Sequence, residues 1–337
     1  YDIGVLSKNS SLIHYSMNFW KWGRFMVQKQ ENFYPSSDGR TRIHAITWQG
    51  EGQPRAVLQL VHGICEYVDR YDAFASFLAE RGFLVVGNDH LGHGKSWEQP
   101  EGEGLFAEEK GWDRVVEDVE ALRAKTAAEH PGLPYFLLGH SMGSFVTRTW
   151  LIRYPGRADG AILCGTGQQS PAVVGFGRAF TGALIRLHGP LYRSELVRQL
   201  AFGAYNRGFS PRRTENDWIC SDEAVVDAYC ADRSCQFLPT VSLYHDMMGG
   251  IRLISDPSEQ KRMEPATPIL FIAGQEDPVG EKGAGVERAW RGFLQAGCRK
   301  VEKILYPGGR HEILNETFKQ KVWQDVLDWL ERILKTA

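Results

Sequence analysis

The feature that most constrains the fold is a repeated alternation of short apolar runs with amphipathic helical segments. The runs of strand length occupy residues 41–48, 56–61, 83–87, 135–138, 161–164, 268–273 and 301–305. The segments with helical periodicity occupy residues 71–81, 112–129, 144–153, 284–296 and 318–335. Strands and helices that alternate in this way are typical of a mostly parallel sheet covered by helices on both faces. The sequence therefore predicts the α/β class.

The alternation stops once, between residues 167 and 262. This stretch contains no clean strand and is rich in Phe, Trp and Met, and the strand pattern resumes after it. A helical segment between two strands of one sheet is typical of an inserted cap. The 337 residues are about twice the usual size of one domain, which leaves room for such an insertion. We predict a core formed by residues 32–166 and 263–337, a helical cap (lid) at 167–262 and an N-terminal arm at 1–31.

The arm differs from the rest of the chain in composition. Residues 13–27 combine aromatic side chains and Met with Lys21 and Arg24. One interpretation is a helix that rests on a lipid surface, with its aromatic and basic residues at the level of the headgroups. The other is an arm that packs on the body of the protein or on a second subunit. Packing fits better because the charge is modest and Gly23 interrupts the helical pattern. Peripheral membrane contact and a homo-oligomer formed through the arm both stay open.

Charge and cysteine content exclude several classes of function. The 39 Lys and Arg residues nearly balance the 41 Asp and Glu residues, so the formal net charge is −2 and no basic field exists for nucleic acid. The six cysteines are irregularly spaced and predict neither a disulfide framework nor a zinc site. No run of about 18 apolar residues is present to span a bilayer. We expect a cytoplasmic protein; because the chain begins at Tyr1 and not at Met, a removed signal peptide also stays open.

A Gly-His-Ser-Met-Gly sequence at residues 139–143 carries the strongest chemical signal. The G-x-S-x-G pattern alone is weak, but here it follows the predicted strand 135–138 and opens the predicted helix 144–153. At a strand-to-helix turn the pattern is typical of a nucleophile elbow, in which a strained turn exposes the serine hydroxyl. Glycine is needed on each side because a larger side chain would crowd the neighbouring backbone. We therefore predict that Ser141 is the nucleophile.

A serine hydroxyl needs a base to accept its proton, and His311 is the candidate. Three histidines follow Ser141, and two of them, His188 and His245, fall in the cap. His311 instead falls in the loop after the last predicted strand, at the edge of the sheet where the elbow emerges. We predict that it is the general base.

The acid that orients this histidine is expected in a turn at the same edge of the sheet. Asp277 follows the strand 268–273, and its short side chain before Pro278 suits a fixed inward position. The neighbouring Glu276 is the alternative, whereas Asp256 fits better as a helix or turn cap. We predict that Asp277 is the acid.

Two backbone N–H groups are expected to hold the oxyanion. The residue after the nucleophile, Met142, supplies one, and Ile64, in the loop after strand 56–61, supplies the other. His62 in the same loop is predicted to be structural and not a base.

Together these residues resemble the monoacylglycerol lipase/lysophospholipase branch of the α/β-hydrolases, which also contains serine aminopeptidase-like members. The motifs that carry the resemblance are His62–Glu66 (His-Gly-Ile-Cys-Glu), Arg70-Tyr71, Asp89–Ser96 (Asp-His-Leu-Gly-His-Gly-Lys-Ser), residues 139–143, Asp277 and His311. The resemblance runs from about Asn32 to the C-terminus and implies an α/β-hydrolase fold. Two positions depart from the family pattern, because Cys65 and Ser144 stand where glycine is common.

The resemblance implies a serine esterase or lipase that hydrolyses single-chain acyl esters, monoacylglycerol- or lysophospholipid-like, through an acyl-enzyme and without a metal or organic cofactor. An aminopeptidase-like peptidase, an acyltransferase and a non-catalytic ligand-binding receptor are the alternatives. A peptidase would need a pair of carboxylates in the cap to hold an amine. The carboxylates available there have the pattern of helix-surface charges: Asp222, Glu223, Asp227 and Asp232.

The aromatic and Met residues of the cap are expected mainly to pack, but some should line an acyl tunnel. The candidates are Phe180, Phe202, Phe209, Trp218 and Met247.

Two clusters could be mistaken for metal sites. The resemblance makes residues 89–94 a structural loop that supports the elbow. Cys220, Cys230 and Cys235 are not at zinc spacing. We predict no metal site.

Overall fold

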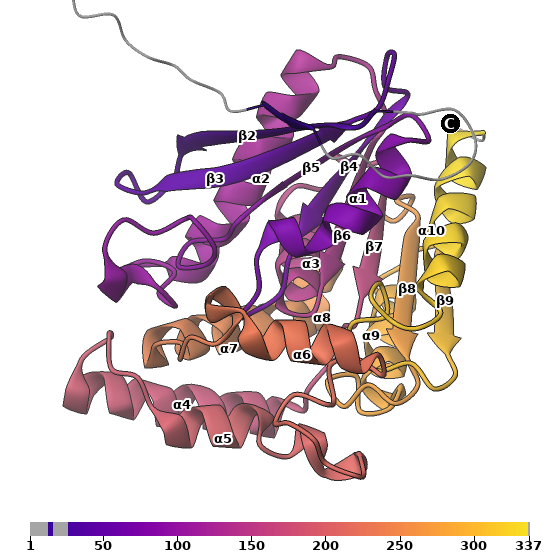
Figure 1. The fold of residues 1–337 in the computed structure, drawn as a ribbon. Helices are drawn as coiled ribbons and strands as arrows, with labels where there is room; N and C mark the ends of the chain where they lie inside the picture. Colours follow the sequence, from indigo (N-terminus) through magenta and orange to yellow (C-terminus); the bar gives the residue numbers. More distant parts are fainter. Residues whose placement is uncertain (1–12, 16–25, 336–337) are drawn as a thin grey trace, which may run out of the picture.

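The computed structural model describes residues 13–15 and 26–335, and these form one nine-stranded sheet with helices on both faces (Figure 1). The strands are β1 (Ile13–Tyr15), β2 (Gln28–Pro35), β3 (Arg42–Gln49), β4 (Ala56–Val61), β5 (Phe83–Asn88), β6 (Tyr135–His140), β7 (Gly160–Cys164), β8 (Ile269–Gly274) and β9 (Val301–Tyr306). Their order is β1-β2-β3-β5-β4-β6-β7-β8-β9. The first four strands in this order pair antiparallel, and from β5 to β9 every pair is parallel. The predicted α/β class is confirmed.

Strand β2 was not anticipated from the sequence. Its first residues are polar, and only one side chain of the strand, Tyr34, is buried, so no apolar run marks it. It begins at Gln28, inside the predicted arm 1–31, so the core sheet starts earlier than the predicted boundary. Strand β1 pairs with β2, and the helical interpretation of the arm is therefore wrong for these three residues. The predictions for residues 1–12 and 16–25 lie outside the described residues.

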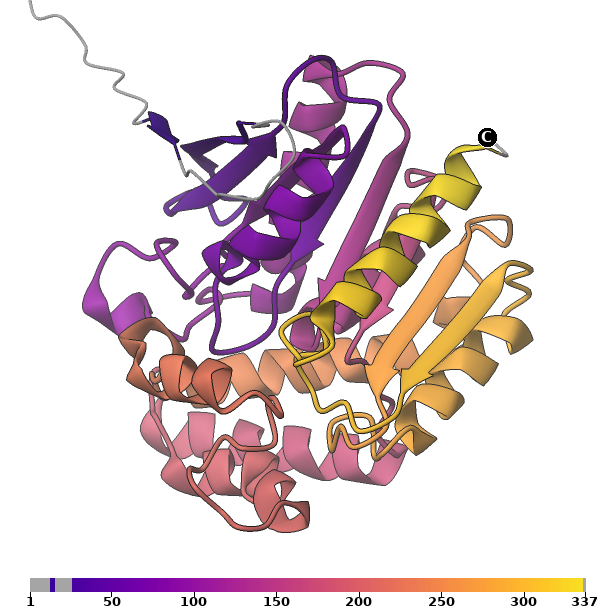
Figure 2. The same cartoon turned by 45° about the vertical axis from the view of Figure 1, so that its right-hand side comes forward.

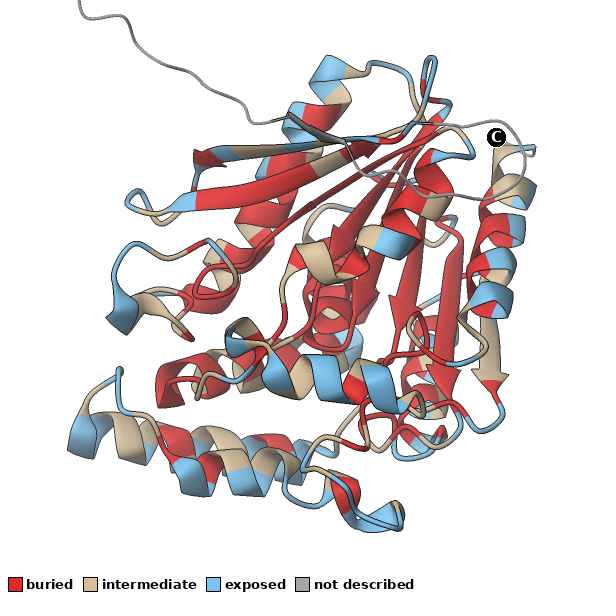
Figure 3. Cartoon of the chain, viewed as in Figure 1, coloured by how far each residue is buried: buried red, intermediate tan, exposed pale blue. Residues whose placement is uncertain are grey.

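Two helical layers cover the sheet and divide the core into two clusters. Helices α1 (Asp72–Ala79) and α10 (Lys319–Leu334) cover one face, and α2 (Gly111–Glu129), α3 (Met142–Arg153) and α9 (Ala284–Gln295) cover the other (Figures 1 and 2). Side chains of a strand alternate between the two clusters: Leu58 and Leu60 pack towards α1 and α10, and Val57 and Val61 pack towards α2 and α3. The central strands are buried throughout (Figure 3). This rigid sheet fixes the positions of the loops at its carboxyl edge.

The segment between β7 and β8 forms a helical layer across the carboxyl ends of the parallel strands (Figure 2). Its helices are α4 (Pro171–His188), α5 (Glu195–Phe202), α6 (Glu223–Ala231), α7 (Val241–Ser255) and α8 (Pro257–Gln260). Helix α7 packs on α3, and α4 packs on α7 from outside. We keep the limits 167–262 for the cap as a proposal that this arrangement supports. Within the part of the chain that the structure covers, no helix has the length and apolar character needed to cross a membrane.

Arg148 of α3 holds both ends of this cap. The side chain is buried, and its guanidinium donates hydrogen bonds to the carbonyl oxygens of Gly167 and Ile254 and to the amide oxygen of Gln168. Burial lowers the pKa of Arg148 to about 9. Three oxygens thus take the place of the water that a buried guanidinium has lost.

Candidate active site

Ser141 occupies a strained turn between β6 and α3. Its φ is 53° and its ψ is −123°, a conformation that residues with a side chain rarely adopt. The glycines two positions before and after it have no room for a side chain. A Cβ on Gly139 would lie 2.3 Å from Thr147 Oγ1, and one on Gly143 would lie 2.0 Å from the carbonyl oxygen of Val61. The steric reason given for the two glycines is thus visible in the structure.

His311 and Asp277 meet at the same edge of the sheet, from the loops that follow β9 and β8. The His311 Nδ1–H group donates to both carboxylate oxygens of Asp277, at 3.1 and 3.0 Å. Asp277 is fully buried, and its Oδ1 also accepts from the N–H of Val279 at 2.9 Å. The two alternative acids point elsewhere, because Glu276 pairs with Lys282 near the surface and Asp256 caps α8.

Ser141 and His311 line one cavity of about 310 Å³ under the cap. The structure has no hydrogen bond between the serine hydroxyl and the imidazole. Such contacts are commonly long before substrate binds and tighten in the complex with substrate. The arrangement therefore brings the predicted nucleophile, base and acid together around one space.

The predicted oxyanion donors are both available. Met142 is the first residue of α3, where the N–H groups have no partner within the helix. Among the described residues, none accepts a hydrogen bond from the N–H of Ile64, which also lines the cavity. The next residue, Cys65, has a φ of 54°, a conformation that favours glycine. The backbone at this position thus explains why glycine is common there in the family that the sequence resembles.

The histidines of the neighbouring loops have structural partners. His62 Nδ1–H donates to the carbonyl oxygen of Gly63 at 2.7 Å, and His62 Nε2 accepts from the N–H of His90 at 2.9 Å. Burial lowers the pKa of His90 to about 3 and that of His93 to about 4, so both rings are neutral. Asp89 accepts hydrogen bonds from backbone N–H groups and from His44. Within residues 13–15 and 26–335, no group of His, Cys, Asp and Glu has the arrangement of a metal site.

A buried cluster of charges beneath the cavity was not predicted as part of the site. Glu66 accepts hydrogen bonds from Tyr71 at 3.0 Å and from His140 Nδ1 at 2.9 Å, and it pairs with Arg70 at 3.2 Å. Arg70 also forms two hydrogen bonds with Glu312, at 2.7 and 2.9 Å. The sequence resemblance pointed to Glu66 and Arg70 only as parts of a motif. The partners His140 and Glu312 are distant in sequence and could be found only from the fold.

This cluster connects the three loops of the site. Glu66 accepts from the N–H of Gly63 in the oxyanion loop, and His140 belongs to the elbow. His140 Nε2 lies 3.4 Å from the carbonyl oxygen of His311. Burial lowers the pKa of His140, but the charge of Glu66 and its hydrogen bond, together with the charge of Glu312, raise it above the ordinary value. Burial alone would raise the pKa of Glu66, but the charges of His140 and Arg70 lower it.

We expect the Glu66→Gln variant to be less stable by about 3–5 kcal/mol, because it removes the buried carboxylate that pairs with His140 and Arg70. In the wild type, the stabilisation from the raised His140 pKa is complete below about pH 6.5 and is lost as the pH rises through that pKa. The stabilisation from the lowered Glu66 pKa is complete above about pH 4.3 and is lost as the pH falls. Denaturant unfolding between about pH 2 and pH 9 measures both effects.

The matched control for this variant is Glu109→Gln, since Glu109 is exposed. It should change the free energy of unfolding by less than about 0.5 kcal/mol. If Glu66→Gln and the wild type had the same free energy of unfolding, and both lost stability equally above pH 6.5, the Glu66–His140 pair would be contradicted.

The cap residues predicted to line an acyl tunnel divide into two groups. Phe202, Trp218 and Met247 line the catalytic cavity. Phe180 and Phe209 are corrected, because they do not line it: Phe180 stacks on Phe176 in α4, and Phe209 packs under the guanidinium of Arg310. Irregular spacing in the sequence gave no means to separate the two groups.

Comparison with known proteins agrees with this geometry. Residues 52–318 match the family described as serine aminopeptidase, S33. The monoglyceride lipase of Homo sapiens is 35% identical over 298 residues, which cover 86% of this chain and 87% of that protein. The monoacylglycerol lipase of Mycolicibacterium smegmatis is 28% identical and covers 87% of this chain and 94% of that protein.

A solved structure is similar over nearly the whole chain. The thermostable carboxyl esterase of Bacillus coagulans, in complex with glycerol, superposes with a TM-score of 0.85 at 28% identity, over 91% of this chain and 99% of that one. The sheet, the elbow and the family match agree, and the chain belongs to the serine aminopeptidase, S33, family of α/β-hydrolases.

Proposed function

We propose that the protein is a serine hydrolase that cleaves carboxylic esters of single acyl chains, of the monoacylglycerol type. The observation that carries the proposal is that Ser141 and His311, which is hydrogen-bonded to Asp277, border one largely apolar cavity. The lipase and esterase names of the matched proteins support ester hydrolysis, and the chain is an ester hydrolase of this family.

The geometry supports acyl transfer in two steps. Ser141 attacks the acyl carbonyl while His311 accepts its proton, and Asp277 stabilises the imidazolium that forms. The N–H groups of Ile64 and Met142 hold the oxyanion. His311 then gives the proton to the leaving alcohol, and water repeats the sequence on the acyl-enzyme.

The cap side of the cavity fits an acyl chain. Apolar side chains from α3, α5 and α7 face the space above the nucleophile: Phe145, Leu200, Phe202, Met247 and Ile251. Burying a hydrocarbon chain here contributes about 0.8 kcal/mol for each methylene removed from water.

An apolar surface on α4, α5 and their connection supports contact with lipid, which we include in the proposal. Its members are large apolar side chains that the cap leaves in solvent: Val173, Phe176, Leu187, Leu191, Leu196 and Leu200. Val173 and Leu200 are 52% and 58% exposed and also line the catalytic cavity. The cavity therefore reaches the protein surface within this patch, and a single-chain ester could pass from a lipid surface to Ser141 without crossing water.

We expect the double variant Leu187→Ser/Leu191→Ser to bind liposomes about 10–100-fold more weakly, because each leucine would bury apolar area in the lipid. Flotation with phosphatidylcholine vesicles measures binding, and hydrolysis of a soluble short-chain ester shows that the site is intact. Leu294→Ser is the matched control, since Leu294 is 41% exposed on α9, outside the apolar surface of α4 and α5. Equal flotation of all three proteins would exclude this surface.

The aminopeptidase alternative is less well supported. Three carboxylates line the cavity: Glu66, Glu281 and Glu312. Arg70 and His140 neutralise Glu66 and Glu312, and Glu281 pairs with Arg288, so no surplus negative charge remains to hold an ammonium group. The cap carboxylates have other partners: Asp222 caps α6, Glu223 and Asp227 pair with Arg213, and Asp232 accepts from Tyr67.

A substrate panel tests the proposal. We expect labelling of Ser141 by a fluorophosphonate, hydrolysis of p-nitrophenyl acyl esters and monoacylglycerols, and no cleavage of proline p-nitroanilide. Preferential anilide cleavage would favour the peptidase, and failure to label would favour a non-catalytic receptor. Acyl glycerols formed in excess glycerol would show an acyltransferase.

A further inference from the structure

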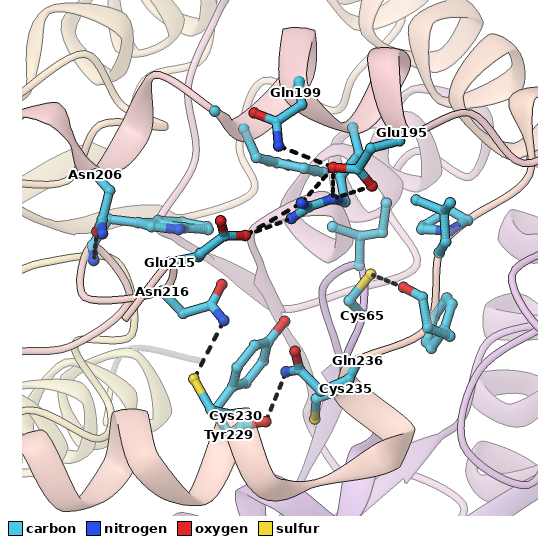
Figure 4. A pocket seen from close by; sticks show the side chains of 18 of the residues that line it. Cys65, Glu195, Gln199, Asn206, Glu215, Asn216, Tyr229, Cys230, Cys235 and Gln236 are labelled. Carbon is cyan, nitrogen blue, oxygen red and sulfur yellow. Dashed lines mark hydrogen bonds and ion pairs between the residues drawn. The ribbon is translucent and has the colours of Figure 1, made fainter. Parts of the chain in front are cut away.

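Figure 4 shows side chains that line a second cavity, of about 700 Å³. This cavity adjoins the catalytic cavity. It lies between α5, the loop before α6 and the loop before α7, and we call it the polar cleft. Ile64, Phe202, Trp218 and Tyr229 line both cavities. The Trp218 ring lies 5.1 Å from the ring of His311, measured between centroids. The polar cleft therefore begins next to the group that protonates the leaving alcohol.

Helix α5 turns its polar side towards this cleft. Glu195, Arg198 and Gln199 line it, whereas Leu196 and Leu200 are each 58% exposed to solvent. A helix at a protein surface usually has the opposite orientation, with the apolar stripe inwards. The reversal supplies the cleft with hydrogen-bonding groups.

The charges that line the cleft compensate one another. Arg198 forms hydrogen bonds with Glu195 at 2.9 Å and with Glu215 at 3.2 Å, and Arg212 lies 3.5 Å from Glu215. Figure 4 labels the two carboxylates of this group, Glu195 and Glu215. Two carboxylates and two guanidiniums leave no net charge. A phosphate would find both guanidiniums already paired beside two carboxylates, and an ammonium group would find no unpaired carboxylate.

Neutral polar atoms in the cleft still lack protein partners. Asn216 and Gln199 each use an amide N–H in a hydrogen bond, but no described residue donates to their amide oxygens. Tyr244 is 1% exposed and lines the cleft, and its hydroxyl has no partner among the described residues. Buried polar groups are normally satisfied, so this hydroxyl beside a polar cavity is a candidate hydrogen-bond partner for a hydroxyl group of a ligand.

We propose that the polar cleft binds the alcohol part of the ester, and that the preferred alcohol is an uncharged polyol of about the size of a hexose. A cleft of about 700 Å³ falls in the range of sites for ligands much larger than glycerol. This inference rests on the proposed function and specifies its substrate. When Ser141 Oγ forms its bond to the acyl carbon, the ester C–O bond breaks and His311 protonates the polyol oxygen. The free polyol then leaves from the polar cleft while the acyl chain stays on Ser141.

Four esters of one fatty acid test the substrate: glucose monolaurate, glycerol monolaurate, lauroyl lysophosphatidylcholine and p-nitrophenyl laurate. We expect kcat/KM for the glucose ester to exceed that for the glycerol ester by about tenfold, because more hydroxyl groups find partners. The lysophospholipid should be the poorest of the four. Equal kcat/KM for the glucose and glycerol esters would overturn the proposal.

Variants test the cleft itself. Tyr244→Phe and Asn216→Leu should each lower the ratio of kcat/KM for glucose monolaurate to that for p-nitrophenyl laurate by about tenfold, with thermal midpoints measured alongside. Glu215→Gln leaves a surplus positive charge and should improve hydrolysis of the lysophospholipid relative to the glucose ester. Glu223→Gln, on the cap but outside the cleft, is the control and should leave every ratio unchanged.

The outcomes separate the two proposals. Unchanged ratios in Tyr244→Phe and Asn216→Leu, with p-nitrophenyl laurate still hydrolysed, would overturn the polyol subsite alone. Absence of hydrolysis of all four esters, with no fluorophosphonate labelling, would overturn the proposed function and the subsite with it.

Discussion

Replacing Ser141 with alanine is expected to lower kcat for ester hydrolysis by about 10⁶-fold and to leave the fold intact. The hydroxyl is the only group on the elbow that can form the acyl-enzyme, and His311 has no proton to transfer without it. Alanine keeps the Cβ that the strained backbone at φ 53° already accommodates. Hydrolysis of p-nitrophenyl butyrate and labelling by a fluorophosphonate measure the loss, and thermal unfolding checks the fold.

The control for this variant is Ser76→Ala, a buried serine of α1 far from the elbow in sequence. It should retain most of the activity. Hydrolysis by Ser141→Ala at a rate near that of the wild type would remove the nucleophile assignment and the mechanism built on it.

The second large effect is expected for Asp277→Asn, with a loss of about 10⁴-fold in kcat. The wild-type carboxylate accepts a hydrogen bond from His311 Nδ1–H, which leaves Nε2 free to accept the serine proton. An asparagine amide can donate to Nδ1 instead and stabilise the tautomer whose Nε2 already carries a proton. Single-turnover kinetics with a p-nitrophenyl ester would measure the acylation rate directly.

Glu276→Gln separates this explanation from a general effect of charge in the same turn. Glu276 pairs with Lys282 and has no contact with the histidine, so its variant should lose less than about threefold. A large loss in Glu276→Gln together with a small loss in Asp277→Asn would exchange the two assignments.

Local patterns in the sequence were sufficient for the parallel strands and the elbow. Buried strands such as β4 and β6 are continuous apolar runs, and the two glycines around Ser141 mark a turn that only small residues allow. The contact between Asp277 and His311 could also be predicted from the sequence. The carboxyl ends of β8 and β9 meet at one edge of the sheet, and the loops there offer few acidic residues and one histidine.

Other features depend on contacts that no local pattern records. Strand β2 has mostly polar or partly exposed side chains, and pairing with β3, not hydrophobic burial, defines it. The Glu66–His140 pair joins residues from two separate loops, and its partner Glu312 comes from a third. Helix α5 has the residue spacing of an ordinary amphipathic helix, but its polar side faces the cleft and its leucines face solvent. Only the position of the cavities shows this orientation.

The hydrogen bonds of Arg148 limit how the cap can move relative to the sheet. The Arg148 guanidinium binds the chain where the cap leaves the sheet, at Gly167, and near where it returns, at Ile254. The whole cap therefore cannot rotate away from the sheet as one body without breaking these hydrogen bonds. The opening of the cavity beside Val173 and Leu200 lies instead between the outer helices α4 and α5, away from these hydrogen bonds. The route of the acyl chain to Ser141 would consequently pass the same two helices that carry the exposed apolar surface.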